Sequence, residues 1–334
     1  MFWRTGQEMS IDKGQKYSVN PSFKITLLHP KYLFTWLSFG ILFMLSFLPL
    51  NLQLNIGKLL GVFLHLVSPN RRKIAETNLK LCFPEKSNEE IRDLVLNNFK
   101  NIGIGTFEIA LAWWSSDRKI RNLNITFKNK ELFEKAEREG KGMLVLARHS
   151  THIELDARLL CLDLNFGGMF KEQTNQVFNY LMIRSRNKYA QPVFTNHEGR
   201  IAINSVRDDV KLIYASDQDY GKEVSEFIPF YKIKAATVSL PAHLSKSGIR
   251  VALVDIRREK NRYVLEAFEL PPCDNEYKFL LQMNQYYEKI ISKAPEQFLW
   301  MHRRFKTRPS GEKSFYSKWK KRDRRREKIR NKRN

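Results

Sequence analysis

The sequence predicts an α/β fold with a mixed sheet flanked by helices, preceded by an N-terminal membrane helix. From residue 125 onwards, short apolar runs of strand length alternate with longer segments of helical periodicity. Residues 32–57 contain no charged side chain. One apolar run, residues 143–147, ends at Arg148-His149-Ser150, and chemistry usually sits at such a strand edge. These three observations indicate a membrane-associated α/β protein.

The N-terminal part of the chain predicts attachment to a membrane. Residues 1–31 are a basic lead-in with little hydrophobic periodicity. The apolar run that starts at Tyr32 is long enough to cross a hydrocarbon core of roughly 30 Å, which takes about 20 residues. Pro49 is expected to bend or end this helix, and apolar residues between 52 and 66 predict a second, interfacial helix. Basic residues flank the run on both sides, so its orientation stays open. The alternative is a buried helical hairpin.

The next segments predict helices that cover a sheet. Residues 70–82 form a helical pattern that Pro84 stops, and Ser87 with Glu90 makes a capping box before the next helix. A further helix is expected at residues 104–114. The predicted strands and helices that follow are 125–127 (strand), 129–138 (helix), 143–147 (strand), 167–170 (strand), 175–188 (helix), 211–215 (strand), 238–246 (helix), 249–256 and 263–268 (strands) and 276–294 (helix).

We therefore expect four parts in this chain. They are the basic segment 1–31, a membrane-spanning or interfacial segment 32–68, an α/β domain 69–316 and a basic tail 317–334. The tail is nearly all Lys and Arg, which is typical of a disordered or frayed end that binds anions without specificity.

Charge and cysteine usage narrow the class of partner. A formal net charge of +23 over 334 residues predicts an anionic partner, and nucleic acid, an acidic protein and a phosphorylated lipid surface all fit that charge. The three cysteines lie far apart without a Cys-x-x-Cys pair, so neither a disulfide framework nor a zinc knuckle is expected. Such usage is typical of the reducing, cytosolic side of a membrane.

His149 and Glu154 form the candidate catalytic pair. An imidazole that leaves a strand in the spacing His-x-x-x-x-Glu can meet a carboxylate on the first turn of the next helix. A neutral imidazole can take a proton from an alcohol, and a carboxylate on its other nitrogen fixes the tautomer. The substrate would then supply the hydroxyl. His152 and Asp156, at i and i+4, are a competing pair that we expect on the surface in a supporting role.

The closing segment, residues 295–309, interleaves aromatic and basic side chains. Arginines give bidentate contacts to phosphate or carboxylate, while aromatic rings suit a lipid boundary. Arg303, Arg304, Lys306 and Arg308 are therefore candidates for binding an anionic head group. The alternative is a solvated basic face beside a core helix.

Three blocks in order resemble the late acyltransferases of lipid A biosynthesis, within the lysophospholipid acyltransferase group. The first is His149-x4-Glu154. The second is Asp217-Gln218-Asp219-Tyr220-Gly221 followed by Phe227-x-Pro229-Phe230, and the third is the run from Ala294 to Pro309, APEQFLWMHRRFKTRP. The resemblance covers roughly residues 32–316 and implies a lysophospholipid acyltransferase-like fold for residues 69–316.

The resemblance implies transfer of a fatty acyl group from acyl carrier protein to a hydroxyl of Kdo2-lipid IVA. In this scheme His149 deprotonates the hydroxyl, Glu154 holds the imidazole, and Arg184 or Arg186 donates to the oxyanion of the thioester. The family commonly has Arg-x-Arg followed directly by Ser-Asn-Lys. This chain has Arg184-Ser185-Arg186-Asn187-Lys188, a shift of one that leaves the choice between the arginines open.

Further implications of the resemblance concern binding and location. Asp217 and Asp219 join the four basic residues of the closing segment as substrate-binding candidates, and no metal or cofactor is implied. The partners are the acidic carrier protein, the phosphorylated glycolipid and the membrane, with no specific nucleic acid. The expected location is the bacterial inner membrane, single-pass or monotopic, with the catalytic domain on the cytoplasmic face.

Other functions fit parts of the same sequence. An acyltransferase of the same group could use a lysophospholipid or another glycolipid as acceptor, with acyl-CoA as donor. A membrane-tethered RNA-binding protein built around the basic tail is the alternative from outside the enzymes. A thioesterase is disfavoured because the chain has no Gly-x-Ser-x-Gly elbow.

Overall fold

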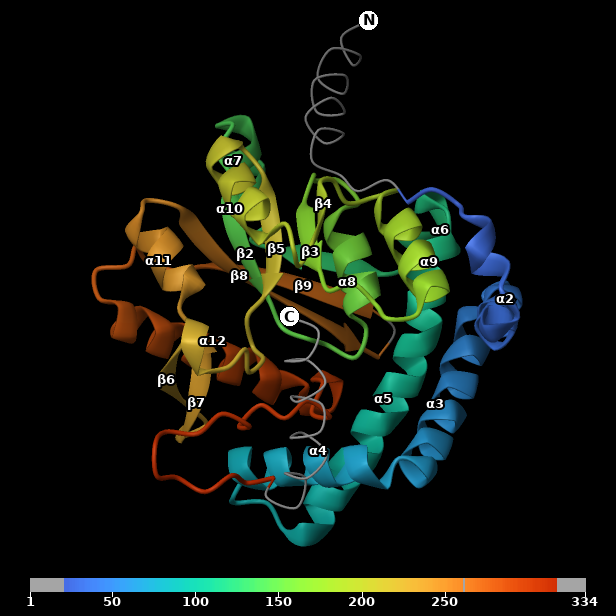
Figure 1. The fold of residues 1–334 in the computed structure, drawn as a ribbon, viewed down its shortest axis with the longest axis horizontal. Helices are drawn as coiled ribbons and strands as arrows, with labels where there is room; N and C mark the ends of the chain where they lie inside the picture. Colours follow the sequence, from blue (N-terminus) through green and yellow to red (C-terminus); the bar gives the residue numbers. More distant parts are fainter. Residues whose placement is uncertain (1–20, 261, 317–334) are drawn as a thin grey trace, which may run out of the picture.

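A seven-stranded mixed sheet with helices on both faces forms the centre of the molecule (Figure 1). The computed structural model describes residues 21–260 and 262–316, so the expected basic tail and most of the basic lead-in lie outside the described residues. The sheet order is β1-β9-β8-β2-β5-β3-β4, and only the β8–β9 pair is antiparallel. The strands of this sheet are β1 (Ile125–Lys128), β2 (Met143–Ala147), β3 (Gly167–Phe170), β4 (Val193–Thr195), β5 (Lys211–Ala215), β8 (Arg250–Glu259) and β9 (Arg262–Glu269). A separate antiparallel hairpin joins β6 (Ser225–Phe230) and β7 (Ile233–Val238).

Two hydrophobic cores lie on the two faces of this sheet. Successive side chains of a strand point to opposite faces, so Leu144 and Leu146 of β2 enter one core while Met143 and Val145 enter the other. The α-helices are α2 (Leu33–Leu45), α3 (Leu50–Val67), α4 (Pro69–Cys82), α5 (Asn88–Trp114), α6 (Asp117–Arg121), α7 (Glu131–Arg138), α8 (Ile153–Leu160), α9 (Gln176–Arg186), α10 (Gly199–Asp208), α11 (Leu240–Lys246) and α12 (Glu276–Lys293). Short 3₁₀ turns are η1 (Ile25–Leu28), η2 (Pro30–Tyr32), η3 (Lys222–Val224) and η4 (Pro295–Gln297). The first core contains residues of α4, the first half of α5, α10, α11 and α12, and the second those of α7, α8, α9 and the end of α5.

Most predicted elements of the domain are confirmed. The strands at 143–147, 167–170 and 211–215 have the predicted bounds, and the capping box between Ser87 and Glu90 is present in both directions. The expected break before residue 104 is wrong, because α5 runs unbroken over 27 residues. Four features of the domain were not predicted: the strand β4, the helices α6 and α10, and the β6–β7 hairpin.

Two glycines in the middle of α5 allow close helix packing. A Cβ on Gly103 would lie 2.1 Å from the carbonyl oxygen of Gly57 and 2.4 Å from the nitrogen of Gly61, both on α3. A Cβ on Gly105 would lie 1.9 Å from the carbonyl oxygen of Thr151, just after the His149 strand end. Because only glycine fits these contacts, α5 lies backbone to backbone against both α3 and the candidate site.

Adding a methyl group at Gly103 should therefore separate α3 from α5. We expect Gly103→Ala to lower the free energy of unfolding by at least about 1–3 kcal/mol, the usual cost of overpacking. The matched control is Gly40→Ala in α2, where the added Cβ meets nothing within 4 Å and the variant should be neutral or slightly stabilised. Thermal melts in detergent compare the two, and equal melting temperatures would contradict the close packing.

The uncharged N-terminal run folds as two helices. Pro49 marks the break as predicted, and the interfacial helix expected after it is α3. The first helix, α2, has only 13 residues and at 1.5 Å per residue is too short for a hydrocarbon core of about 30 Å. Among the described residues, α3 with 18 residues is the helix long and apolar enough to cross a membrane. The single spanning helix expected from Tyr32 is therefore replaced by this pair.

Candidate active site

His149 and Asp217 meet at the carboxyl edge of the central strands. Ala147 of β2 is paired in parallel with Ala215 of β5, so the residues two positions further on lie opposite each other. The Nδ1 atom of His149 lies 2.6 Å from Oδ1 of Asp217, and the main-chain N–H of His149 donates to Oδ2 at 3.0 Å. The carboxylate accepts from Nδ1–H and leaves Nε2 as the basic nitrogen.

The environment of this pair suits a general base. The Asp217 side chain is fully buried, whereas the His149 side chain is 23% exposed and can be reached by a substrate. Burial alone would raise the pKa of Asp217, but the His149 ring and its N–H hold that pKa below the usual value. Tyr287 of α12 fixes both strand ends, because its hydroxyl lies 2.8 Å from Ser216 Oγ and donates to the carbonyl of Ala147 at 3.1 Å.

Glu154 is not the partner of the His149 ring, which corrects the predicted dyad. It does lie on the first turn of α8, but its carboxylate is buried and accepts hydrogen bonds from Trp113 Nε1 at 2.8 Å and Arg186 Nε at 3.1 Å. A second bond from Arg186 Nη2 makes the ion pair bidentate. Although burial opposes ionisation, Arg186 and Trp113 hold the pKa of Glu154 below its usual value. The carboxylate of the His-x-x-x-x-Glu spacing therefore belongs to a buried ion pair with Arg186.

The two candidate arginines have different surroundings. Arg186 is partly buried, paired with Glu154 and positioned over the ring of Phe170 at 5.5 Å from its centroid. Arg184 is exposed and donates to the hydroxyl of Tyr180 at 2.6 Å. Of the two arginines, Arg186 is the one bonded to α8, through Glu154.

His152 and Asp156 are buried, which corrects their expected surface position. Their side chains join through Nδ1 and Oδ1 at 2.6 Å, and His152 Nε2 lies 3.0 Å from Oε1 of Gln297. They hold the turn between β2 and α8 against the closing segment. Gln297 was not predicted as a site residue, although it belongs to the closing block.

Three of the predicted substrate-binding residues make hydrogen bonds within the fold. Asp219 accepts from the main-chain N–H of Thr307 at 2.6 Å and from its hydroxyl at 2.8 Å. Arg304 is buried and donates to the carbonyl of Ala236 at 2.6 Å, and Arg308 donates to the carbonyl of Lys234 and to Glu312. They fasten the closing segment to the hairpin and to the turn after β5. Of the other two candidates, Lys306 is exposed and Arg303 is partly buried.

His302 of the closing segment was also missed by the sequence argument. Burial lowers the pKa of His302 to about 4, with Asp217 acting in the opposite direction and His149 in the same one. Its imidazole therefore stays neutral at physiological pH and adds no charge near the pair.

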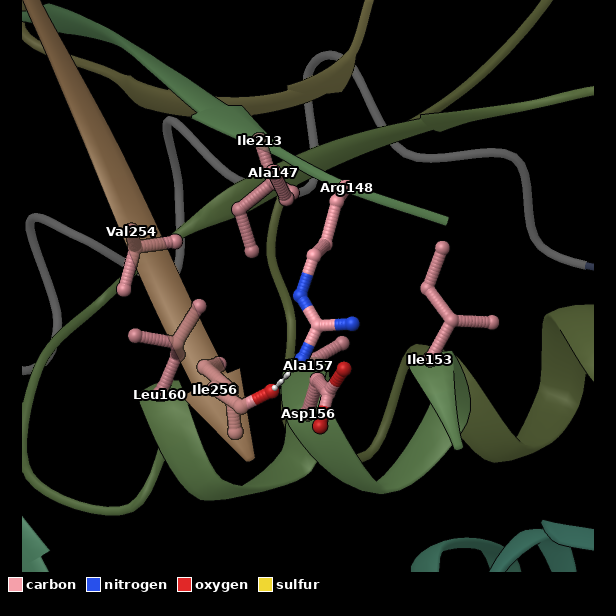
Figure 2. A pocket seen from close by; sticks show the side chains of 9 residues that line it. All are labelled: Ala147, Arg148, Ile153, Asp156, Ala157, Leu160, Ile213, Val254 and Ile256. Carbon is pink, nitrogen blue, oxygen red and sulfur yellow. Dashed lines mark hydrogen bonds between the residues drawn. The ribbon is translucent and has the colours of Figure 1, made fainter. Parts of the chain in front are cut away.

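A small pocket beside the turn between β2 and α8 contains a buried cation. Arg148, 2% exposed, donates from Nη2 to the carbonyl of Ile256 at 2.9 Å, and its Nε lies 3.4 Å from Asp255. Figure 2 shows its guanidinium reaching into the pocket next to the Asp156 carboxylate. The space is about 30 Å³, and among the described residues Nη1 has no hydrogen-bond partner. The pocket is far too small for a substrate, so Arg148 belongs to the support of the site.

Comparison with known proteins confirms the resemblance. Residues 20–307 match the family described as bacterial lipid A biosynthesis acyltransferase. A lipid A biosynthesis lauroyltransferase of Escherichia coli (strain K12) is 31% identical over 303 residues, covering 89% of this chain and 99% of the relative. The palmitoleoyltransferase of that organism is 30% identical over 300 residues, covering 88% and 98%. Its myristoyltransferase is 27% identical over 300 residues, covering 87% and 93%. The chain therefore belongs to the bacterial lipid A biosynthesis acyltransferase family.

Proposed function

We propose that this acyltransferase of lipid A biosynthesis moves a fatty acyl group from acyl carrier protein to a hydroxyl of Kdo2-lipid IVA. The observation that carries the proposal is the His149–Asp217 pair, a base with a free Nε2 at a strand edge, in a chain of this family. The acceptor brings the hydroxyl, so the enzyme needs no serine or cysteine nucleophile.

The reaction proceeds through a tetrahedral intermediate. His149 Nε2 takes the proton of the acceptor hydroxyl while its oxygen attacks the thioester carbon. Asp217 stabilises the imidazolium that forms. The intermediate collapses by breaking the carbon–sulfur bond, and the imidazolium returns its proton to the departing thiolate. The products are the new ester and the free thiol of the carrier.

Arg186 is the proposed donor to the oxyanion of that intermediate. Its guanidinium has five N–H donors, and the pair with Glu154 uses Nε and Nη2. The Glu154 carboxylate therefore orients the guanidinium and leaves the N–H donors of Nη1 available for the oxyanion. A preorganised donor of this kind stabilises charge that develops only in the transition state.

The charge and the apolar surface support these substrates and a membrane location. The carrier protein is acidic and the acceptor carries phosphates and carboxylates, which a chain of net charge +23 attracts. The exposed large apolar side chains of η1, α2, the turn after it and α3 include Ile25, Leu28, Leu33, Phe34, Leu37, Ile41, Met44, Phe47, Leu52, Leu59, Phe63 and Leu66. Exposed apolar side chains in this number suit contact with a lipid bilayer. We propose the inner membrane, with the catalytic domain on its cytoplasmic face.

The test is a product assay with defined donors and acceptors. Purified protein in detergent receives lauroyl-, palmitoleoyl- or myristoyl-carrier protein with Kdo2-lipid IVA, and mass spectrometry follows the gain of one acyl group. Parallel reactions contain acyl-CoA and a lysophospholipid. We expect product with the carrier protein and lipid IVA. Product only with the lysophospholipid would overturn the proposed acceptor in favour of the second acyltransferase hypothesis.

A further inference from the structure

A second histidine, His152, is buried three residues after the proposed base. It is 1% exposed and stands at the N-cap of α8. Both of its ring nitrogens face acceptors: Nδ1 faces Asp156 at 2.6 Å and Nε2 faces Gln297 at 3.0 Å. The ring of His152 takes no part in the proposed reaction. Its neighbours determine whether it is protonated.

The backbone of β8 fixes which end of the Gln297 amide faces His152. Gln297 Oε1 accepts from the main-chain N–H of Arg258 at 2.9 Å, and its Nε2 donates to the carbonyl of the same residue at 2.8 Å. A main-chain N–H can only donate and a carbonyl can only accept, so the amide cannot be flipped. The oxygen therefore faces His152 Nε2, and that nitrogen must carry a proton.

The Nδ1 atom of His152 is also protonated. The hydroxyl of Ser150 accepts from the main-chain N–H of His152 at 3.1 Å and donates to Oδ2 of Asp156, which is much closer to it than Nδ1 of the ring at 3.4 Å. The Oδ1 atom of that carboxylate then accepts from Nδ1–H of the ring. With both nitrogens protonated, His152 is an imidazolium.

The charges around the ring balance this cation. Asp156 on α8 and Glu108 on α5 are the acids that face it, Arg258 on β8 is the other cation, and Tyr263 on β9 donates to Glu108 at 2.6 Å. Burial lowers the pKa of His152, but Asp156 and Glu108 outweigh burial and Arg258, and the pKa lies above its usual value. Glu108 pairs with Arg258, and Asp156 pairs with the imidazolium of His152.

The residues around His152 also hold the proposed base. Leu299 N–H donates to the carbonyl of His149 at 2.9 Å, and Thr151 N–H donates to the carbonyl of Gln297 at 2.9 Å. Gln297 thus bonds to this turn twice, through its main-chain carbonyl at Thr151 and through its side-chain oxygen at His152. A shift of Gln297 would therefore move Thr151 and His152, two and three residues after His149.

We propose that His152 is a positioning residue, an imidazolium clamped between Asp156 and Gln297 that fixes the turn carrying His149. The proposal rests on the proposed function in that His149 is the base whose position matters. It assigns a role to the glutamine of the closing segment, which joins the C-terminal part of the chain to the catalytic turn.

The protonation state can be measured without any activity assay. The full-length protein in detergent, labelled with ¹⁵N in its seven histidines, reports each ring nitrogen by NMR, and His152→Asn assigns the signals of this ring. We expect both nitrogens of His152 to be protonated at pH 7.5. A ring with one unprotonated nitrogen would overturn the clamp even if the enzyme is active.

Two substitutions at Gln297 separate positioning from general structure. Gln297→Glu keeps an acceptor for His152 Nε2, whereas Gln297→Met keeps the length but has none. Both lose the donation to the carbonyl of Arg258. We expect Gln297→Met to lower kcat by at least about tenfold with KM changed by less than about twofold, and Gln297→Glu to retain activity within about threefold of wild type. Equal losses in both variants would overturn the role of the acceptor.

The pH dependence of stability adds a control. A histidine whose folded-state pKa is raised stabilises the fold fully below its unfolded pKa of about 6.5, and the gain is lost as pH rises through the folded value. The difference in melting temperature between wild type and His152→Gln should therefore shrink with rising pH. His243→Gln, which removes an exposed histidine paired with Glu276, is the matched control. A difference that grows with pH would contradict the imidazolium. An inactive wild type with this NMR and melting behaviour would overturn the proposed function and leave the protonated clamp standing.

Discussion

Asp217→Asn should lower kcat by about four orders of magnitude, the size of effect seen when a catalytic histidine is held in the wrong tautomer. The main-chain N–H of His149 needs an acceptor at the position of Oδ2, so the oxygen of the asparagine would turn to it. The amide nitrogen would then face Nδ1, which must accept. The ring proton of His149 would then lie on Nε2, the nitrogen that must be unprotonated to accept the proton of the acceptor hydroxyl.

The measurement is the single-turnover rate of acyl transfer, with melting temperatures to confirm folding. Asp163→Asn is the matched control, because that carboxylate lies in an exposed ion pair with Arg121. It should leave the rate within about twofold of wild type, as is usual for exposed pairs. Wild-type rates in Asp217→Asn would show that the carboxylate does not orient the base.

Glu154→Gln should weaken the fold and the reaction by a different route. The amide oxygen would accept from Trp113, so the amide nitrogen would face the guanidinium of Arg186, donor against donor. Removing one partner of a buried pair costs about 3–5 kcal/mol, and misplacing an oxyanion donor lowers kcat about 10²-fold. The base itself is untouched, so the pH profile of the rate should keep its shape.

The control for this prediction is Arg184→Gln, which removes an exposed arginine from α9, the helix that carries Arg186. We expect its kcat within about threefold of wild type. Because the folded-state pKa of Glu154 is lowered, the contribution of the ion pair to stability is present at neutral pH and is lost as pH falls through that folded value. Loss of the pH dependence of kcat in Glu154→Gln, with an unchanged melting temperature, would support the original His149–Glu154 dyad instead.

The elements of the site were predictable from the sequence, but their pairing was not. The strands at 143–147 and 211–215 and the polar residues after each were clear from the apolar pattern. His149 and Asp217 are brought together by the neighbouring places of β2 and β5 in the sheet, across 68 residues of chain. Local spacing carries no information on strand order, so the sequence points to the nearest carboxylate, Glu154, in place of Asp217.

The basic closing segment shows a second limit of sequence reasoning. Arg304 and Arg308 have the composition of a head-group site, yet both donate to carbonyls of β7. Composition does not distinguish an arginine that binds a phosphate from one that fastens a hairpin, because both need the same donors. The unbroken α5 is a similar case, because the sequence pattern predicts separate helices where Gly103 packs one continuous helix against α3.

The central claim is that Asp217 acts through the ring of His149, and a double-mutant cycle tests it most directly. Single-turnover rates are measured for wild type, His149→Ala, Asp217→Asn and the double variant. Groups that act as a unit are not additive, so adding Asp217→Asn to His149→Ala should change the rate by less than about twofold. A further loss equal to that of Asp217→Asn alone would contradict the account.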